Sequence, residues 1–414
     1  MSLPSDDELD RLRIVGDEDA DRFVDGLTAR LGGIAALADA LTAVTWWYDV
    51  GNAPPPGVPP EVVAFVREPP PPPPPWIDDA AIARAQALFQ ECRYAALVVL
   101  ACGSLPACYA QPNIADVLSA SGRLMVDVRR RLQETVAFTS IVMTPGSLAP
   151  GGAGLQWIRK VRLMHAMMRA LKLATPVPRQ RATGDDLADM LLSRLWSDAH
   201  LAPVNQVELG YVLLTFSWVA LRGWKRLGIR LTDRERSDYL LAWAWIGRLL
   251  GVTDPLLGYV NDRGAEAAGA EALFERIRGR YELGTEAGQL LTAALGVIVV
   301  EQQAQALRKM VLPALPEVLA LAVAAALKWL PRFTEESAIA MGRSLMRSLA
   351  GLPTARQLRV GRSPLLYWLP GWLLVGSIHW PALRGRKARG SGVYAELGRL
   401  IDAAVAVPRE SLRR

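Results

Sequence analysis

The stretch WIRKVRLMHAMMR, residues 157–169, decides how the rest of the chain is interpreted. Its apolar residues recur three and four positions apart, which is the spacing of one face of an α-helix. The same spacing recurs along the chain from Trp76 onward, and alternating strand patterns are almost absent. The sequence therefore predicts an all-α fold, with breaks at glycines and prolines. The helical segments are Ala81–Phe89, Val126–Phe138, Ile158–Leu173, Leu187–Leu195, Tyr211–Leu221, Tyr239–Leu250, Gln302–Met310, Pro316–Leu330 and Glu335–Leu349.

Three blocks follow from the pattern: an N-terminal helical segment with a proline-rich strap (1–80), a helical core (81–300) and a C-terminal helical extension (301–414). The first block holds an amphipathic segment, Asp25–Val44, and an aromatic trio, Trp46–Tyr48. It ends in seven consecutive prolines, Pro69–Pro75. Such a run forms a polyproline II rod of about 20 Å. We interpret it as a strap or spacer; the alternative is a docking site for a proline-reading domain.

Composition limits the class of protein. With 51% hydrophobic and 21% charged residues over 414 positions, the chain is not intrinsically disordered for most of its length. Mean hydropathy is +0.16, yet the apolar runs Leu290–Val300 and Val318–Leu327 are too short to cross a bilayer, and Ser363–Ile378 carries two prolines. A buried helical core, or a chain lying against a membrane surface, explains the hydropathy better than spanning helices.

Charge and cysteine content exclude further classes. The net charge of +6 is spread out, and the dense basic cluster Arg384–Arg389 has no interleaved aromatic residues, so no nucleic-acid motif supports binding to DNA or RNA. Three cysteines without a CxxC pair predict neither a disulfide scaffold nor structural zinc. The acidic stretch Met1–Asp25 lacks an export signal, so we expect a cytoplasmic protein.

Most familiar enzyme classes lack their motifs in this sequence. There is no H-E-x-x-H helix, no G-x-S-x-G elbow, no Walker loop and no G-x-G-x-x-G after a strand. Of the three histidines, His200 and His379 have no partner at ligand spacing, and we interpret both as structural. His165 is the histidine that remains.

His165 lies on an apolar helix face. Helical spacing places it on one edge with Ile158, Val161 and Met168. An imidazole among aliphatic and thioether groups suits a haem ligand, since the macrocycle needs an apolar slot and one nitrogen aimed at iron. One turn to either side, Arg162 and Arg169 would pair with the propionates. The alternative is a satisfied core histidine.

The upstream helix, Asp127–Phe138, carries Arg131, Glu134 and Thr135 on one face. On an arbitrary helix this would be a solvated face with an intrahelical ion pair. Facing a haem, the trio would supply a cation for developing negative charge, a carboxylate for proton transfer and a hydroxyl to orient the ligand.

These residues resemble a known family, the latex clearing proteins (rubber oxygenases) and the wider MpaB-like haem oxygenases. The similarity rests on Arg131-Leu-x-Glu-Thr135 followed thirty positions later by His165, and it covers roughly residues 75–260. Further matching motifs are Pro75-Trp76-x-Asp78, Ser104-Leu105-Pro106 with Tyr109, Pro203-Val-Asn205-Gln206, Phe216-Ser217, Leu227-Gly228-Ile229, Tyr239, Trp243 and Ile246-Gly247-x-x-Leu250-Gly251.

The resemblance implies a globin-like helical core around one haem b, flanked by N- and C-terminal helical extensions. It implies that His165 is the proximal iron ligand and that Arg131 and Thr135 lie on the distal side. The implied reaction is cleavage of a carbon–carbon double bond by dioxygen, giving two carbonyl groups. Cys102 and Cys108 would be small buried fillers near the haem.

Two departures from that family shape our expectation. Glu134 stands where rubber-cleaving members can carry an iron-capping lysine, and an acid cannot be that neutral nitrogen ligand. The family's upstream glutamate has as its nearest counterpart Asp116, so either Asp116 or Glu134 is the general base. Because no export signal is visible, we expect a smaller lipophilic alkene, such as an isoprenoid, rather than rubber.

Two rival functions remain open at this point. A haem peroxidase or peroxygenase would use Arg131 and Glu134 to break the O–O bond of peroxide. A non-catalytic haem sensor or carrier would use the proline strap and the Arg384–Arg389 cluster to recruit a partner or a membrane surface. The oligomeric state is not encoded in these motifs.

Overall fold

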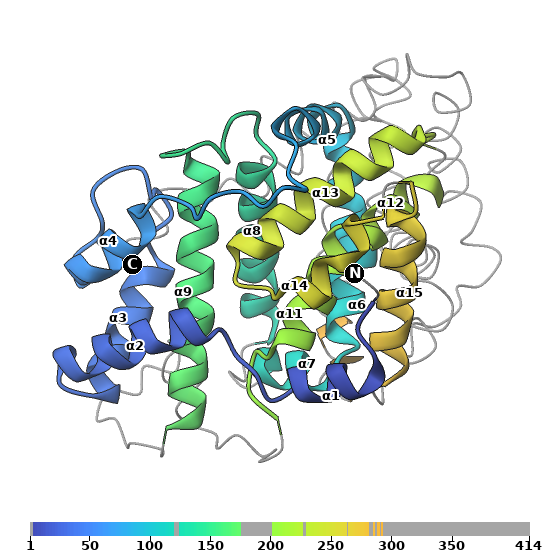
Figure 1. The fold of residues 1–414 in the computed structure, drawn as a ribbon. Coiled ribbons are helices and arrows are strands. Elements are labelled where there is room, and N and C mark those ends of the chain that lie inside the picture. The colour runs from blue at the N-terminus through green and yellow to red at the C-terminus, as the bar shows by residue number, and fades with distance from the viewer. Residues whose placement is uncertain are drawn as a thin grey trace, which may run out of the picture.

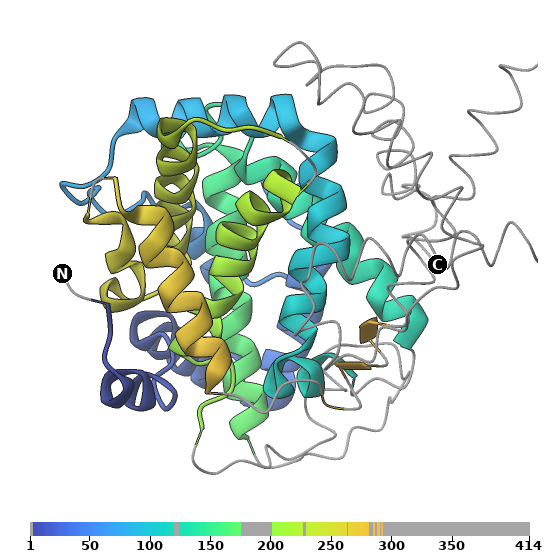
Figure 2. The same cartoon turned by 90° about the vertical axis from the view of Figure 1, so that its right-hand side faces the viewer.

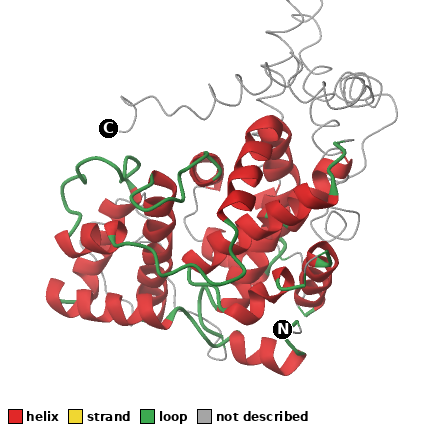
Figure 3. Cartoon of the chain, turned by 45° about the horizontal axis from the view of Figure 1, so that its top comes forward, coloured by secondary structure: helices red, strands yellow, loops and turns green. Residues whose placement is uncertain are grey.

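The structure is a computed structural model that describes residues 3–119, 124–174, 201–226, 229–262 and 264–280, with 285, 288–289 and 291–292. Throughout these ranges the regular elements are helices and no strand occurs, which confirms the all-α prediction (Figure 3). The elements are α1 (Asp6–Leu12), α2 (Glu18–Leu31), α3 (Ile34–Thr45), α4 (Pro60–Arg67), α5 (Asp79–Val99), η1 (Leu100–Ser104), α6 (Leu105–Tyr109), α7 (Pro112–Ser119), α8 (Leu124–Val142), α9 (Ala153–Leu173), α11 (Gln206–Phe216), α12 (Trp218–Arg226), α13 (Asp233–Leu249), α14 (Asp254–Leu257), η2 (Gly258–Val260) and α15 (Glu266–Gly279) (Figure 1). The predicted segments Leu187–Leu195 and those after residue 300 lie outside the described residues, as do His200 and His379.

The N-terminal helices α2, α3 and α4 pack around α9 (Figure 1). The predicted continuous segment Asp25–Val44 is two helices, because Gly32 and Gly33 have φ angles of 89° and 121°. Only glycine adopts such angles without strain, so the chain ends one helix there and begins another. The apolar side chains of this layer form what we call the small core: Ala20, Val24, Leu27, Leu37, Ala38, Ala40, Leu41, Val44, Trp47, Val50, Val62 and Val66 with Trp157, Leu163, Ala166, Met167 and Leu171 of α9.

A second body of packed side chains, the large core, joins α5, α6, α11, α13 and α15. Its largest fully buried side chains include Trp224, Tyr239 and Trp243, whose rings pack in sequence at centroid distances of 4.9 and 6.3 Å. Aromatic rings of this size dominate the burial of apolar area in a helical core. The large core therefore holds together the helices that follow the proline strap.

The long helix of this core is bent. The segments Asp79–Arg93 and Ala95–Tyr109 meet at 82°, and the second segment contains the π-helical turn η1 (Figure 2). A second difference from the predicted pattern lies at Ser217, where the segment Tyr211–Leu221 divides into α11 and α12. The Ser217 hydroxyl donates to the Leu213 carbonyl, a local bond that competes with regular helix geometry.

The proline run has neither helix nor strand and connects α4 to α5, crossing α9 and α8 in the view of Figure 1. Its start is fixed to α9, because Glu68 forms an ion pair with Arg159. Its end is fixed by Asp78, whose carboxylate accepts from the Ala80 amide at 2.9 Å and begins α5. These contacts fix the two ends of the proline run, and its role as a strap stays a prediction.

Among the described helices, no single one has the length and apolar content to cross a membrane, although two bent helix pairs, α2 with α3 and the α5–α6 segment, meet those criteria jointly. Helices α2–α4 share the small core with α9, and the predicted boundary at residue 80 stays a prediction. The block 301–414 lies outside the described residues.

Candidate functional site

Helix α9 lies between the two cores and contributes side chains to both. Leu155 and Ile158 belong to the large core, whereas Trp157, Leu163 and Met167 belong to the small core. On the edge that carries His165, Ile158 packs in the large core and Met168 packs against the small core, so this edge lies where the two cores meet.

His165 combines deep placement with an unsatisfied polar atom. Its Nδ1 is buried and has no hydrogen-bond partner in the part of the chain that the structure describes, while the residue as a whole is partly accessible. Burial lowers the pKa of the imidazole to about 4; the positive charge of Arg169 also lowers it, and Asp17 opposes the shift. The imidazole is thus neutral at neutral pH and keeps a lone pair, which is the state that ligates a metal. A satisfied core histidine would have a partner at this nitrogen, and among the described residues Nδ1 has none.

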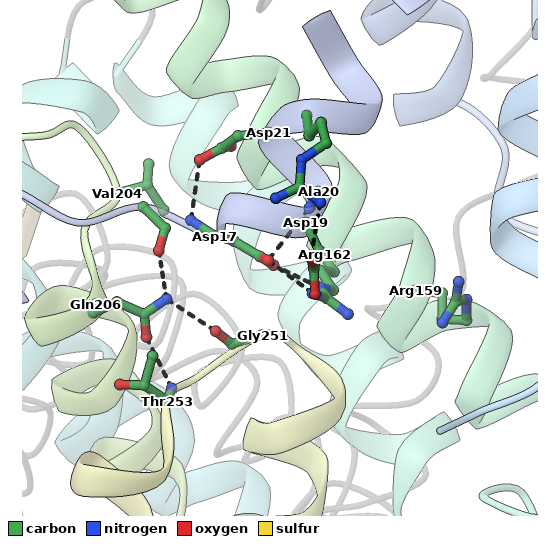
Figure 4. A network of polar contacts seen from close by, with 12 residues as sticks. Asp17, Asp19, Ala20, Asp21, Arg159, Arg162, Val204, Gln206, Gly251 and Thr253 are labelled. Atoms are coloured by element: carbon green, nitrogen blue, oxygen red, sulfur yellow. Dashed lines mark hydrogen bonds and ion pairs between the residues drawn. The ribbon is translucent and has the colours of Figure 1, made fainter. Parts of the chain in front are cut away.

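Arg162 and Arg169, the predicted propionate partners, hold carboxylates of the N-terminal segment. Arg162 donates to both oxygens of Asp17 at 2.5 and 2.7 Å, and Asp17 is only 5% exposed (Figure 4). Arg169 donates through Nε to Asp21 at 2.8 Å and through Nη1 to the Val204 carbonyl at 2.9 Å. Their role toward propionates stays a prediction. The contacts shown here fasten α9 to the first turn of α2 and, through Val204, to the chain before α11.

A buried glutamine extends this attachment to the large core. Gln206 Nε2 donates to the carbonyls of Gly16 (2.7 Å) and Gly251 (2.9 Å), and its Oε1 accepts from the Thr253 amide at 2.9 Å (Figure 4). Gly251 has a φ of 86°, and a Cβ there would collide with the Asp17 carboxylate. The motifs around Gln206 and Gly251 quoted from the sequence therefore serve, at least in these contacts, to join the N-terminal segment to α11 and α13.

On α8, Glu134 is held from two sides. Its Oε1 accepts from the Tyr48 hydroxyl at 3.3 Å and from Arg130 Nε at 3.0 Å. Burial raises the pKa of Tyr48, and the negative charge of Glu134 raises it further. The intrahelical ion pair considered in the sequence does occur, but its basic partner is Arg130. The contact with Tyr48 could not be found from helical spacing.

The other predicted distal residues are only partly described. Thr135 is half-buried on α8, and its carbonyl accepts from the Thr139 hydroxyl at 2.8 Å. Arg131 lies on α8 and Asp116 on α7, but their side chains are outside the described part of the structure. Helix α8 packs beside α9 (Figure 1), so the helices that carry the predicted distal and proximal residues are neighbours.

Other metal chemistry has little support among the described side chains. They include no group of three or more His, Cys, Asp and Glu residues that could hold an ion. The three cysteines are free and buried, and burial raises the pKa of Cys102 and Cys108 to about 12. Those two thiols are therefore protonated at neutral pH. A porphyrin supplies four nitrogens of its own and needs one from the protein, so a lone neutral histidine fits it.

Comparison with known proteins assigns the chain to a family. The family described as "ER-bound oxygenase mpaB/B'/Rubber oxygenase, catalytic domain" matches residues 83–372. No curated protein matches the chain by sequence. A solved structure, "Structure of Latex Clearing Protein LCP in the closed state", is similar with a TM-score of 0.62 at 19% identity, covering 95% of this chain and 91% of that one. At this identity the likeness shows a shared fold. Because the family match spans well over half of the sequence, the chain belongs to the mpaB and rubber oxygenase family.

Proposed function

We propose that this oxygenase-family member binds one haem b through His165 and cleaves a carbon–carbon double bond of a lipophilic, isoprenoid-like substrate. The observation that supports the cofactor is the neutral imidazole of His165, whose buried Nδ1 has no hydrogen-bond partner among the described residues, on the edge of α9 where the two cores meet. An unsatisfied buried polar group costs about 1–3 kcal/mol, so a retained one calls for a partner that supplies the missing interaction.

When bound, the haem would supply the electron chemistry that activates dioxygen toward the alkene. His165 would hold the cofactor through a ring nitrogen that burial keeps unprotonated. On α8, the Thr135 hydroxyl would orient the oxidant and Arg131 would stabilise negative charge on it. The Glu134 carboxylate, which already accepts two hydrogen bonds, would accept or return a proton.

The substrate class is inferred from the surroundings of α9. Both cores that flank it are aliphatic and aromatic, and Phe138 of α8 packs against each of them. Met164 and Met168 lie half-buried beside His165, and thioether side chains adapt to irregular apolar shapes. Such walls favour an alkene without charged groups and exclude water from the reacting atoms.

The test begins with the spectrum of the purified protein. We expect a Soret band that follows haem at one equivalent, and a product with two carbonyl groups when the protein meets an isoprenoid panel and dioxygen. His165→Ala should lose the band with little loss of helix content. Full haem retention in that variant contradicts the ligand assignment, and haem binding without carbonyl products from any alkene contradicts the reaction.

Peroxide is the second candidate oxidant, and the position of Glu134 favours testing it. A carboxylate beside a cation can move a proton across hydrogen peroxide while the O–O bond breaks. Glu134→Gln should then abolish peroxide-dependent turnover while haem binding persists. Turnover that depends on dioxygen and survives in this variant rejects the peroxidase reading.

A further inference from the structure

The aromatic trio Trp46–Tyr48, which we call the aromatic turn, links α3 to both α8 and α9. Each of its residues makes a different contact. Trp47 is buried in the small core, and its indole nitrogen donates to the Asp49 carbonyl at 2.9 Å. Trp46 lies 5.0 Å from the Arg130 guanidinium, and the Tyr48 hydroxyl donates to Glu134. The turn is therefore attached to the two charged residues of α8 that pair with each other.

Lys160 of α9 holds the main chain of this turn. Its ammonium donates to the Trp47 carbonyl at 2.7 Å and to the Thr45 carbonyl at 3.4 Å, and the residue is only 2% exposed. It also lies 4.6 Å from the Trp157 ring and 5.5 Å from the Tyr48 ring. A cation between two rings and two carbonyls is fixed in place, so it fixes the turn that surrounds it. Burial lowers the pKa of Lys160 to about 8, and Glu134 acts in the opposite direction.

The contacts form a chain that ends on one carboxylate oxygen. Lys160 holds the turn, the turn presents the Tyr48 hydroxyl, and that hydroxyl meets Oε1 of Glu134 opposite Arg130. Among the described side chains, the charged and titratable groups that act on this carboxylate come from the turn (Tyr48), from α8 (Arg130) and from α9 (Lys160). Two hydrogen bonds to one oxygen restrict the rotamers of the carboxylate.

We infer that Tyr48 and Lys160, through the aromatic turn, are positioning residues that hold the Glu134 carboxylate oriented as the proton-accepting group of the site. This inference rests on the proposed function, because it gives Glu134 a proton to accept. It makes the segment before the proline strap a part of the site. The step is a proton transfer only: Oε2 of Glu134, the oxygen that Tyr48 and Arg130 leave available in the described contacts, gains a proton and later returns it.

The test uses cyanide binding to the haem-loaded ferric protein at different pH values. Cyanide arrives at neutral pH as hydrogen cyanide, so a carboxylate that takes its proton accelerates binding. Tyr48→Phe and Lys160→Met should each slow binding about fivefold near pH 6, and Glu134→Gln should slow it at least as much. Tyr211→Phe is the matched control, because it removes a hydroxyl that donates to the Ala107 carbonyl at 3.2 Å in the large core.

A double-mutant cycle in the haem-free protein supplies a second, cofactor-independent readout. Thermal unfolding of Tyr48→Phe, Glu134→Gln and the double variant should reveal coupling between the two side chains at pH 7. Profiles of Tyr48→Phe that match those of the wild type and of Tyr211→Phe overturn the inference. A wild-type protein that binds no haem overturns the proposed function and the catalytic role of Glu134 together, an outcome separate from a bound haem with unchanged profiles.

Discussion

Three residues on one face of α9 satisfy their polar groups in two different ways. Arg162 and Arg169, one turn to either side of His165, are paired with Asp17 and Asp21. Between them, His165 keeps a buried Nδ1 that has no hydrogen-bond partner in the described part of the chain. The ion pairs compensate the buried charges, whereas the unsatisfied nitrogen costs free energy. The difference separates the residues that hold the helix from the residue that is available for a ligand.

The largest expected effect comes from breaking the ion pair between Arg162 and Asp17. Arg162→Leu leaves the Asp17 carboxylate buried without its cation, and removal of one partner of a buried pair costs about 3–5 kcal/mol. Urea unfolding with an unchanged m-value should show a loss of this size.

The control for that substitution is the double variant Asp17→Asn with Arg162→Leu. Asparagine keeps the cap on α2, where Asp17 accepts from the Ala20 amide, and carries no charge. The double variant should be more stable than Arg162→Leu alone. A single variant that loses less than about 1 kcal/mol would show that the pair is not the main attachment of α9.

The sequence could predict the helical placement of His165 far better than the partners of Arg162 and Arg169. Helical spacing placed His165 on a helix next in sequence to that of Glu134, because periodicity is a local property, and both α8 and α9 include their predicted segments. The acidic partners of Arg162 and Arg169 are 145 and 148 positions away, and Tyr48 is 86 positions from Glu134. Contacts at such separations depend on the packing of whole helices, which no local pattern records. The assignment of Arg162 and Arg169 to propionates rested on spacing alone for this reason.

Acid should weaken the folded state through protonation of His165. The folded pKa of His165 is about 4, below its ordinary value of 6.5, so on acidification the unfolded chain takes up the proton first. The stability associated with the neutral imidazole is complete above about pH 6.5 and is lost as the pH falls toward 4. We expect a decrease of about 2–3 kcal/mol across this window in the haem-free protein.

Chemical unfolding at half-unit pH steps measures this decrease, and His165→Leu provides the comparison. That variant should lack the part of the slope between pH 6.5 and 4, while the slope from carboxylates at lower pH persists. Equal slopes in the two proteins would mean that the imidazole titrates normally and that its surroundings are wetter than the burial of Nδ1 indicates.

A smaller effect should follow when a methyl group is placed against the ion pair between Asp21 and Arg169. A Cβ at Gly16 would lie 2.5 Å from Asp21 Oδ2 and 2.8 Å from Arg169 Nε, closer than side chains normally approach. Gly16→Ala should therefore cost about 1–2 kcal/mol, because the Asp21–Arg169 pair must shift. At Gly279, near the end of α15, a Cβ meets open space, so Gly279→Ala should be neutral or stabilising. Equal midpoints for the two variants in thermal unfolding would contradict the close approach.

The smallest change in stability, and the one that most directly tests the comparison, is expected for His165→Leu without haem. Leucine fills a similar volume and removes the unsatisfied Nδ1, so the haem-free variant should gain about 1 kcal/mol at pH 7. The same variant should fail to bind haem in a spectroscopic titration. A gain of stability together with a loss of ligand is the pattern of a residue kept for function at a cost to the fold. A loss of stability instead would mean that His165 packs as a core residue. It would then differ from the paired Arg162 and Arg169 only in charge.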